Sequence, residues 1–102
     1  MMTPTESPAA LNSLADTPDG ELLRRFSSRK EEAAFCELVL RHSGMVIATA
    51  LRRGGSWELA QEAAQNVFTS LSRKAARLAG VTTISPWLHR AAVLEAAALL
   101  RR

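Results

Sequence analysis

Two histidines and one cysteine are the side chains best suited to metal binding or nucleophilic catalysis. His42 and His89 have no further ligand at the spacing that a zinc site requires. Cys36 precedes His42 by six residues, which on one helix places the two side chains on different faces. The chain also has no glycine-rich phosphate loop and no catalytic pair of carboxylates. We therefore expect no enzyme, metal or cofactor, and we expect Cys36 to be a small buried hydrophobic residue.

Basic residues beside a tryptophan offer a different chemistry, the binding of nucleic acid. Lys74 and Arg77 precede a loop, and Trp87, His89 and Arg90 follow it. Arg90 lies near the positive end of its predicted helix, where dipole compensation does not explain a base, so it is the best candidate for phosphate contact. Trp87 is either a core anchor or an exposed ring that stacks on unstacked bases.

The charge of the chain is unevenly distributed. Residues 1–20 carry three acids and no base, whereas residues 21–102 carry 13 bases and 7 acids, a net charge of +6. Arginine outnumbers lysine 11 to 2, which suits bidentate contacts with phosphate or carboxylate. A basic folded part favours a nucleic-acid partner.

The composition favours helices. Alanine, leucine and arginine fill 43 of the 102 positions, and tyrosine is absent, so we expect an all-α fold. No apolar run approaches the length of a membrane span, and no segment has the pattern of a secretory signal. A single cysteine excludes an internal disulfide and fits a reducing compartment. We expect a cytoplasmic protein with no membrane partner.

Periodicity and capping signals predict a compact bundle of about four helices at residues 18–102, after a flexible tail at residues 1–17. The segment Thr17–Asp19 begins a short first helix, with Thr17 as N-cap. The segment Ser28–Glu31 is a capping box that begins a long second helix ending near residue 53. This second helix is apolar over a wide arc, which is typical of a central helix, and Gly44 within it indicates a kink or a close approach.

A third helix is predicted at residues 57–78, with Ser56 as N-cap, and a fourth begins at Ser85 as its N-cap and reaches the C-terminus. The third helix has acids at its start and bases at its end. This pattern either complements the helix dipole or forms a docking surface for a partner. Trp57, at the start of the third helix, has the same two interpretations as Trp87.

Four segments, in this order, resemble region 2 of the extracytoplasmic-function sigma factors, which are subunits of bacterial RNA polymerase. The segments are Asp19–Phe26, Ala33–His42, Gln65–Phe68 and Pro86–Ala92. The third reads QNVF and is similar to the family's QEVF; the fourth reads PWLHRAA and is similar to its WLYRIA pattern. The resemblance implies an all-α sigma region 2-like domain.

The resemblance also implies a transcription-initiation module. In such factors the second and third helices dock on the clamp of the polymerase β′ subunit, and the fourth helix and the loop before it capture the unwound, single-stranded −10 promoter element. By position, the residues that would face core RNA polymerase are Glu62, Gln65 and Asn66, with Glu58 on the same helix face. The residues that would face the DNA are Lys74, Arg77, Thr82, Thr83, Trp87, His89 and Arg90. An anti-sigma protein is a further partner that the resemblance implies.

Two departures from the family pattern favour an alternative function. Of the usual acids before the QNVF segment only Glu62 is charged, so we expect weaker electrostatic docking. The polar pair that follows the WLYRIA pattern is replaced by Val93 and Leu94, and Glu95 adds an acid. The alternative is a diverged helical interaction domain that keeps the sigma fold without promoter recognition. Since no region 4 follows, we expect either a fragment of a longer factor or a stand-alone region 2.

Overall fold

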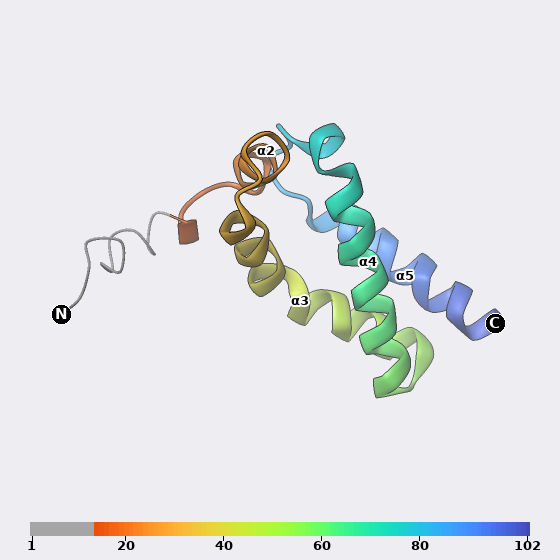
Figure 1. The fold of residues 1–102 in the computed structure, drawn as a ribbon. Coiled ribbons are helices and arrows are strands. Elements are labelled where there is room, and N and C mark those ends of the chain that lie inside the picture. The colour runs from red at the N-terminus through yellow and green to blue at the C-terminus, as the bar shows by residue number, and fades with distance from the viewer. Residues whose placement is uncertain (1–13) are drawn as a thin grey trace.

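The computed structural model describes residues 14–102, which fold into four helices with no strand between them (Figure 1). The helices are α2 (Asp19–Arg29), α3 (Glu32–Gly54), α4 (Trp57–Leu78) and α5 (Ser85–Arg101). This architecture confirms the predicted all-α bundle. Residues 1–13 of the predicted N-terminal tail lie outside the described residues.

The two longest helices share the centre of the bundle. Helix α3 packs against α2, α4 and α5, and α4 likewise contacts each of the other three helices. The main core is built on fully buried leucines: Leu22, Leu23, Leu38, Leu71 and Leu88. A second cluster joins α3, α4 and α5 through small residues: Ala50, Ala60, Ala63 and Ala96. Because the separation of packed helices depends on the side chains between them, these alanines let the three backbones approach closely.

The junction between α2 and α3 differs from the predicted capping box. Ser28 lies inside α2, and its hydroxyl donates to the carbonyl of Arg24 at 2.7 Å. Helix α2 ends only at Lys30, which adopts a left-handed conformation with φ 57°. The carboxylate of Glu31 accepts a hydrogen bond from Arg25 Nε at 2.6 Å. The capping box was therefore wrong, because the left-handed residue closes the first helix and Arg25 engages the glutamate.

The other predicted caps have mixed outcomes. Ser56 caps α4 as predicted, because its Oγ accepts the backbone N–H three residues on at 3.2 Å. The predictions for α2 and α5 are each wrong by one residue. The N-cap of α2 is Pro18 rather than Thr17, and the N-cap of α5 is Ile84 rather than Ser85.

The outward face of α3 is more apolar than the bundle can cover. Leu40 is 77% exposed and Leu51 is 36% exposed. Cys36, predicted to be buried, is exposed as well, because the apolar arc extends beyond the helices that pack on α3. By length and composition alone α3 is long and apolar enough to cross a membrane, contrary to the expectation that no segment approaches this length. The core helix of a globular bundle meets the same criterion.

Two glycines in helices have opposite surroundings. A Cβ on Gly20, near the start of α2, would overlap the carbonyl oxygen of Val81 and lie 3.0 Å from backbone atoms of Gly80. Helix α2 therefore touches the loop between α4 and α5 backbone to backbone. Around Gly44, in α3, a Cβ would have no atom within 4 Å apart from the adjoining backbone of its own helix. The close helix approach considered for Gly44 is therefore absent.

The two glycines give a matched pair of substitutions. Gly20→Ala should lower the free energy of unfolding by about 1–3 kcal/mol, because the loop backbone must move away from the new methyl group. Gly44→Ala should raise it by about 0.5–1 kcal/mol, because alanine is the better helix former and its methyl group meets no neighbour. Urea unfolding followed by circular dichroism measures both values. Equal effects of the two substitutions would contradict the backbone contact at Gly20.

Candidate functional site

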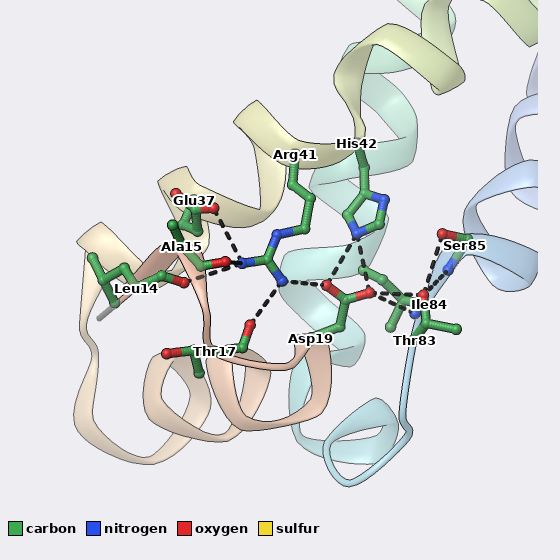
Figure 2. Close-up of polar contacts among 10 residues, drawn as sticks. All are labelled: Leu14, Ala15, Thr17, Asp19, Glu37, Arg41, His42, Thr83, Ile84 and Ser85. Carbon is green, nitrogen blue, oxygen red and sulfur yellow. Dashed lines mark hydrogen bonds and ion pairs between the residues drawn. The ribbon is translucent and has the colours of Figure 1, made fainter. Parts of the chain in front are cut away.

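A buried carboxylate at the start of α2 joins three parts of the chain (Figure 2). Asp19 Oδ1 accepts a hydrogen bond from Arg41 Nη1 at 3.0 Å, and His42 Nε2 lies 3.1 and 3.0 Å from the two carboxylate oxygens. Asp19 Oδ2 also accepts the backbone N–H of Ile84 at 2.9 Å and the hydroxyl of Thr83 at 3.0 Å. Asp19 thus fixes α2 to α3 and to the residues that begin α5.

The guanidinium of Arg41 attaches the segment before α2 to the bundle. It donates to the carbonyl oxygens of Leu14 at 3.1 Å, Ala15 at 3.1 Å and Thr17 at 2.8 Å. Glu37, one turn earlier on α3, accepts a further hydrogen bond at 3.1 Å. Only arginine offers enough donors in a rigid fork to bind this many acceptors at once.

The environment of Asp19 keeps it ionised. Burial raises the pKa of the carboxyl, but hydrogen bonds from the Ile84 backbone N–H, His42 and Thr83 outweigh burial, so the pKa lies below the ordinary value of 3.8. An ionised carboxylate only accepts hydrogen bonds, so His42 presents its Nε2 proton to Asp19. The pairing of these residues was missed by the sequence analysis, which placed Asp19 only at the start of the first helix and of a family-like segment.

A groove of about 210 Å³ lies between α4 and α5. Its lining residues are Val67, Ser70, Lys74, Trp87, Arg90, Ala91, Leu94 and Glu95. Three of them, Lys74, Trp87 and Arg90, are among the predicted DNA-binding residues, and they come from both sides of the intervening loop. The structure therefore brings together two cations and an aromatic ring that are separated in sequence.

The ring of Trp87 is the centre of this group. Lys74 Nζ lies 5.8 Å from the ring centroid, within the range of a cation–π contact. Trp87 is half-buried and packs against the main core, so it anchors α5 while part of its ring faces the groove. Arg90, one turn further on, is exposed. Trp57, by contrast, is 56% exposed and is no core anchor.

An acid that lines the groove is hydrogen-bonded to an amide in a neighbouring hollow. Asn66 Nδ2, on α4, donates to Glu95 Oε1, on α5, at 3.0 Å. Both residues line a second hollow of about 350 Å³ with Thr69, Ser70 and Arg73. Ser70 and Glu95 line both hollows, so the two are neighbours. Asn66 and Glu95 are 29 residues apart, so the sequence analysis could not predict their contact.

The predicted polymerase-facing residues follow one side of α4. Glu58 and Gln65 are exposed. Glu62, between them, accepts hydrogen bonds from Arg102 at 2.6 and 3.0 Å. The Arg102 guanidinium lowers the pKa of the Glu62 carboxyl. The side chain of Asn66 is hydrogen-bonded to Glu95 on α5. The outward part of this row is therefore Glu58, Glu62 and Gln65.

The remaining predicted DNA-binding residues lie outside the groove. Arg77, Thr82 and His89 are exposed and do not line it. The hydroxyl of Thr83 donates to Asp19, so this residue holds the loop in place. Among residues 14–102 no group of three histidine, cysteine, aspartate or glutamate side chains could hold a metal ion. The groove and the outward row of α4 are thus the surfaces with organised polar chemistry.

The Sigma-70 region 2 family matches residues 38–102, which are 65 of the 102 residues, so the chain belongs to this family. No curated protein and no solved structure matches the chain. The family is a non-enzymatic domain of transcription factors and has a role in transcription initiation. Helix α2, with Asp19, precedes the matched residues.

The Asp19 network gives stability that depends on pH. Asp19→Asn should lower the free energy of unfolding by about 3 kcal/mol at neutral pH, because Arg41 and His42 lose a buried anionic partner. Since the folded-state pKa of Asp19 is lowered, its contribution is complete above the ordinary value of 3.8 and is lost as pH falls through the folded-state value. The two unfolding curves should therefore converge at low pH. Urea unfolding between pH 2 and pH 7 would measure the convergence.

Thr83→Val serves as the control for this experiment. It removes one of several hydrogen bonds to Asp19 and leaves the charge in place, so we expect a loss of about 1 kcal/mol at neutral pH and a smaller pH dependence than that of Asp19→Asn. A constant difference between wild type and Asp19→Asn across the whole pH range would contradict the lowered pKa of Asp19.

Proposed function

We propose that this chain is a transcription-initiation module of the extracytoplasmic-function type, which acts in the cytoplasm. It docks on core RNA polymerase through α4 and holds the unwound −10 promoter element in the groove between α4 and α5. The observation that carries the proposal is the grouping of Lys74, Trp87 and Arg90 in one groove. Membership of the Sigma-70 region 2 family supports it.

The groove has the components that single-stranded DNA requires. Single strands bind where bases stack on aromatic rings and where cations follow the backbone. Trp87 provides a ring, and Lys74 and Arg90 provide positive charge in the same groove. The apolar side chains of Val67, Ala91 and Leu94 line the same groove and suit the face of a base. Duplex DNA, whose bases are already stacked, cannot use this ring.

The loop before α5 extends this surface. Arg77 lies in the last turn of α4, Thr82 lies in the α4–α5 loop, and His89 lies near the start of α5; all three are exposed. The Asp19 contacts with Thr83 and Ile84 hold the end of this loop in place. A fixed loop loses less conformational entropy on binding DNA than a free one. We therefore include these exposed residues in the proposed DNA surface.

The outward row of α4 is the proposed polymerase surface. Glu58, Glu62 and Gln65 present acids and an amide on a rigid helix, and such a row suits a basic partner surface. Arg102 neutralises part of the charge on Glu62. Docking on the polymerase must therefore either break the Glu62–Arg102 ion pair or leave it intact at the interface.

The DNA proposal predicts a specific salt dependence. In a Trp57→Phe background Trp87 is the only tryptophan, so its fluorescence reports the groove directly. Single-stranded oligonucleotides should quench it, and their affinity should fall as salt rises. Arg90→Ala should weaken binding and reduce the slope of log affinity against log salt by about one, because one phosphate contact is lost.

Arg53→Ala is the matched control for Arg90→Ala. It removes the same charge from the exposed C-terminal end of α3, and it should leave the slope unchanged. Equal slopes for Arg90→Ala and Arg53→Ala would show that net charge, rather than the groove, drives the binding.

The polymerase proposal predicts a second pattern of effects. Binding of the fluorescently labelled chain to bacterial core RNA polymerase, measured by anisotropy, should weaken about tenfold or more on Glu62→Arg or Gln65→Arg, because each places a cation against a basic partner. Arg102→Ala frees Glu62 and should retain or strengthen binding. Glu32→Arg, the same charge change at the first turn of α3, is the control. A loss of affinity with Arg102→Ala as large as that with Glu62→Arg would assign the effect to the ion pair and overturn the docking surface.

A further inference from the structure

We propose that Glu95 and Asn66 form a base-reading site that selects an unpaired guanine in the groove. This inference rests on the proposed function, because it assumes that single-stranded DNA lies between α4 and α5. It assigns a positive role to Glu95, which at the sequence level marks only a departure from the family pattern.

The residues along α5 place a base beside the acid. Trp87, Ala91, Leu94 and Glu95 all line the groove, so they share one face of the helix. Trp87 and Glu95 are eight residues apart, which is about 12 Å along a helix. That separation accommodates two neighbouring nucleotides, one base on the ring of Trp87 and the next over Ala91 and Leu94. The second base then has its edge toward Glu95.

The charges of the groove orient the strand. Lys74 and Arg90 attract phosphates at the Trp87 end, whereas the Glu95 carboxylate repels them. Arg73 lines the second hollow together with Glu95, so a cation also faces the acid from α4. The backbone therefore follows the basic residues, and the group that reaches Glu95 is the edge of a base.

Hydrogen-bond chemistry then selects the base. A carboxylate only accepts hydrogen bonds, so Asn66 presents its amide nitrogen to Glu95 and keeps one further N–H and its carbonyl oxygen. Glu95 has lone pairs left for two adjacent donors. Guanine offers them as N1–H and the N2 amino group. Adenine and cytosine place a ring acceptor next to their amino group, and thymine flanks its one donor with two carbonyls, so each sets a lone pair against the carboxylate.

The competing interpretation is that the Asn66–Glu95 hydrogen bond only stabilises the packing of α4 against α5. A purely structural hydrogen bond between α4 and α5 needs neither a free acceptor on Glu95 nor a neighbouring groove. It predicts equal affinity of the chain for all four bases. Glu95 lines the groove in which the strand is proposed to lie, and Asn66 lines the neighbouring hollow; this position favours the base-reading role.

The test uses the full chain with Trp57→Phe and oligothymidylates of about nine nucleotides, which differ only in one central base. Quenching of Trp87 fluorescence gives the affinity for guanine, adenine, cytosine, thymine and hypoxanthine at that position. We expect guanine to bind at least about fivefold more tightly than the other natural bases. Hypoxanthine, which lacks only the N2 amino group, should lose most of this preference. Glu95→Gln should abolish it, and Glu32→Gln, the same change outside the groove, should preserve it.

The outcomes separate this inference from the function on which it rests. Salt-dependent binding that Arg90→Ala weakens, but with equal affinity for all bases, keeps the DNA groove and overturns base reading. A guanine preference that survives Glu95→Gln also overturns it. Absence of binding to every oligonucleotide overturns both proposals. Circular dichroism melting of Glu95→Gln shows whether the variant is folded, and the hypoxanthine comparison requires no substitution in the groove.

Discussion

The contact between Asp19 and the end of the α4–α5 loop is the interaction on which the arrangement of the bundle depends. One buried carboxylate accepts hydrogen bonds from α3 and from the residues that begin α5, while Gly20 beside it touches the loop backbone. A buried charge is tolerated only where every lone pair has a donor. The network therefore has one satisfied geometry, and a shift of any helix would leave a polar group without its partner.

This constraint reaches the groove through α5. Because Asp19 fixes Ile84 and Thr83, the first turn of α5 is fixed relative to α2 and α3, and Trp87 then anchors the helix against the core. The groove residues lie on two helices whose relative position is set at both ends, by the buried carboxylate and by the close-packed alanine cluster. Sites on such rigid elements are more precisely formed than sites on loops. The geometry that brings Lys74 onto the ring of Trp87 is thus a property of the whole bundle.

Local patterns in the sequence predict the helices and part of the site. Hydrophobic periodicity gives four helices, and the Ser56 cap, which acts within its own helix, is confirmed. The errors occur where distant contacts decide the outcome. Ser28 has the pattern of a capping box, yet the left-handed Lys30 moves the helix boundary. The Asp19 network joins residues 65 positions apart, and no local pattern encodes such a contact. The sequence did predict three of the groove residues, Lys74, Trp87 and Arg90. It could do so because the family resemblance and the positive charge both indicate the residues on either side of the α4–α5 loop.

The same reasoning changes the meaning of the departures at the end of the chain. From sequence alone, the replacement of a polar pair by Val93 and Leu94, followed by Glu95, favours the loss of promoter recognition. In the structure Leu94 lines the groove, and Glu95 accepts a hydrogen bond from Asn66. The hollows that Glu95 lines also contain three cations, Arg73, Lys74 and Arg90. In the proposed DNA groove, one acid among several basic residues lowers the general attraction for phosphate and penalises nucleobases that present an acceptor. The proposed site therefore has lower affinity and greater discrimination, which is how specificity arises when a site must reject close competitors.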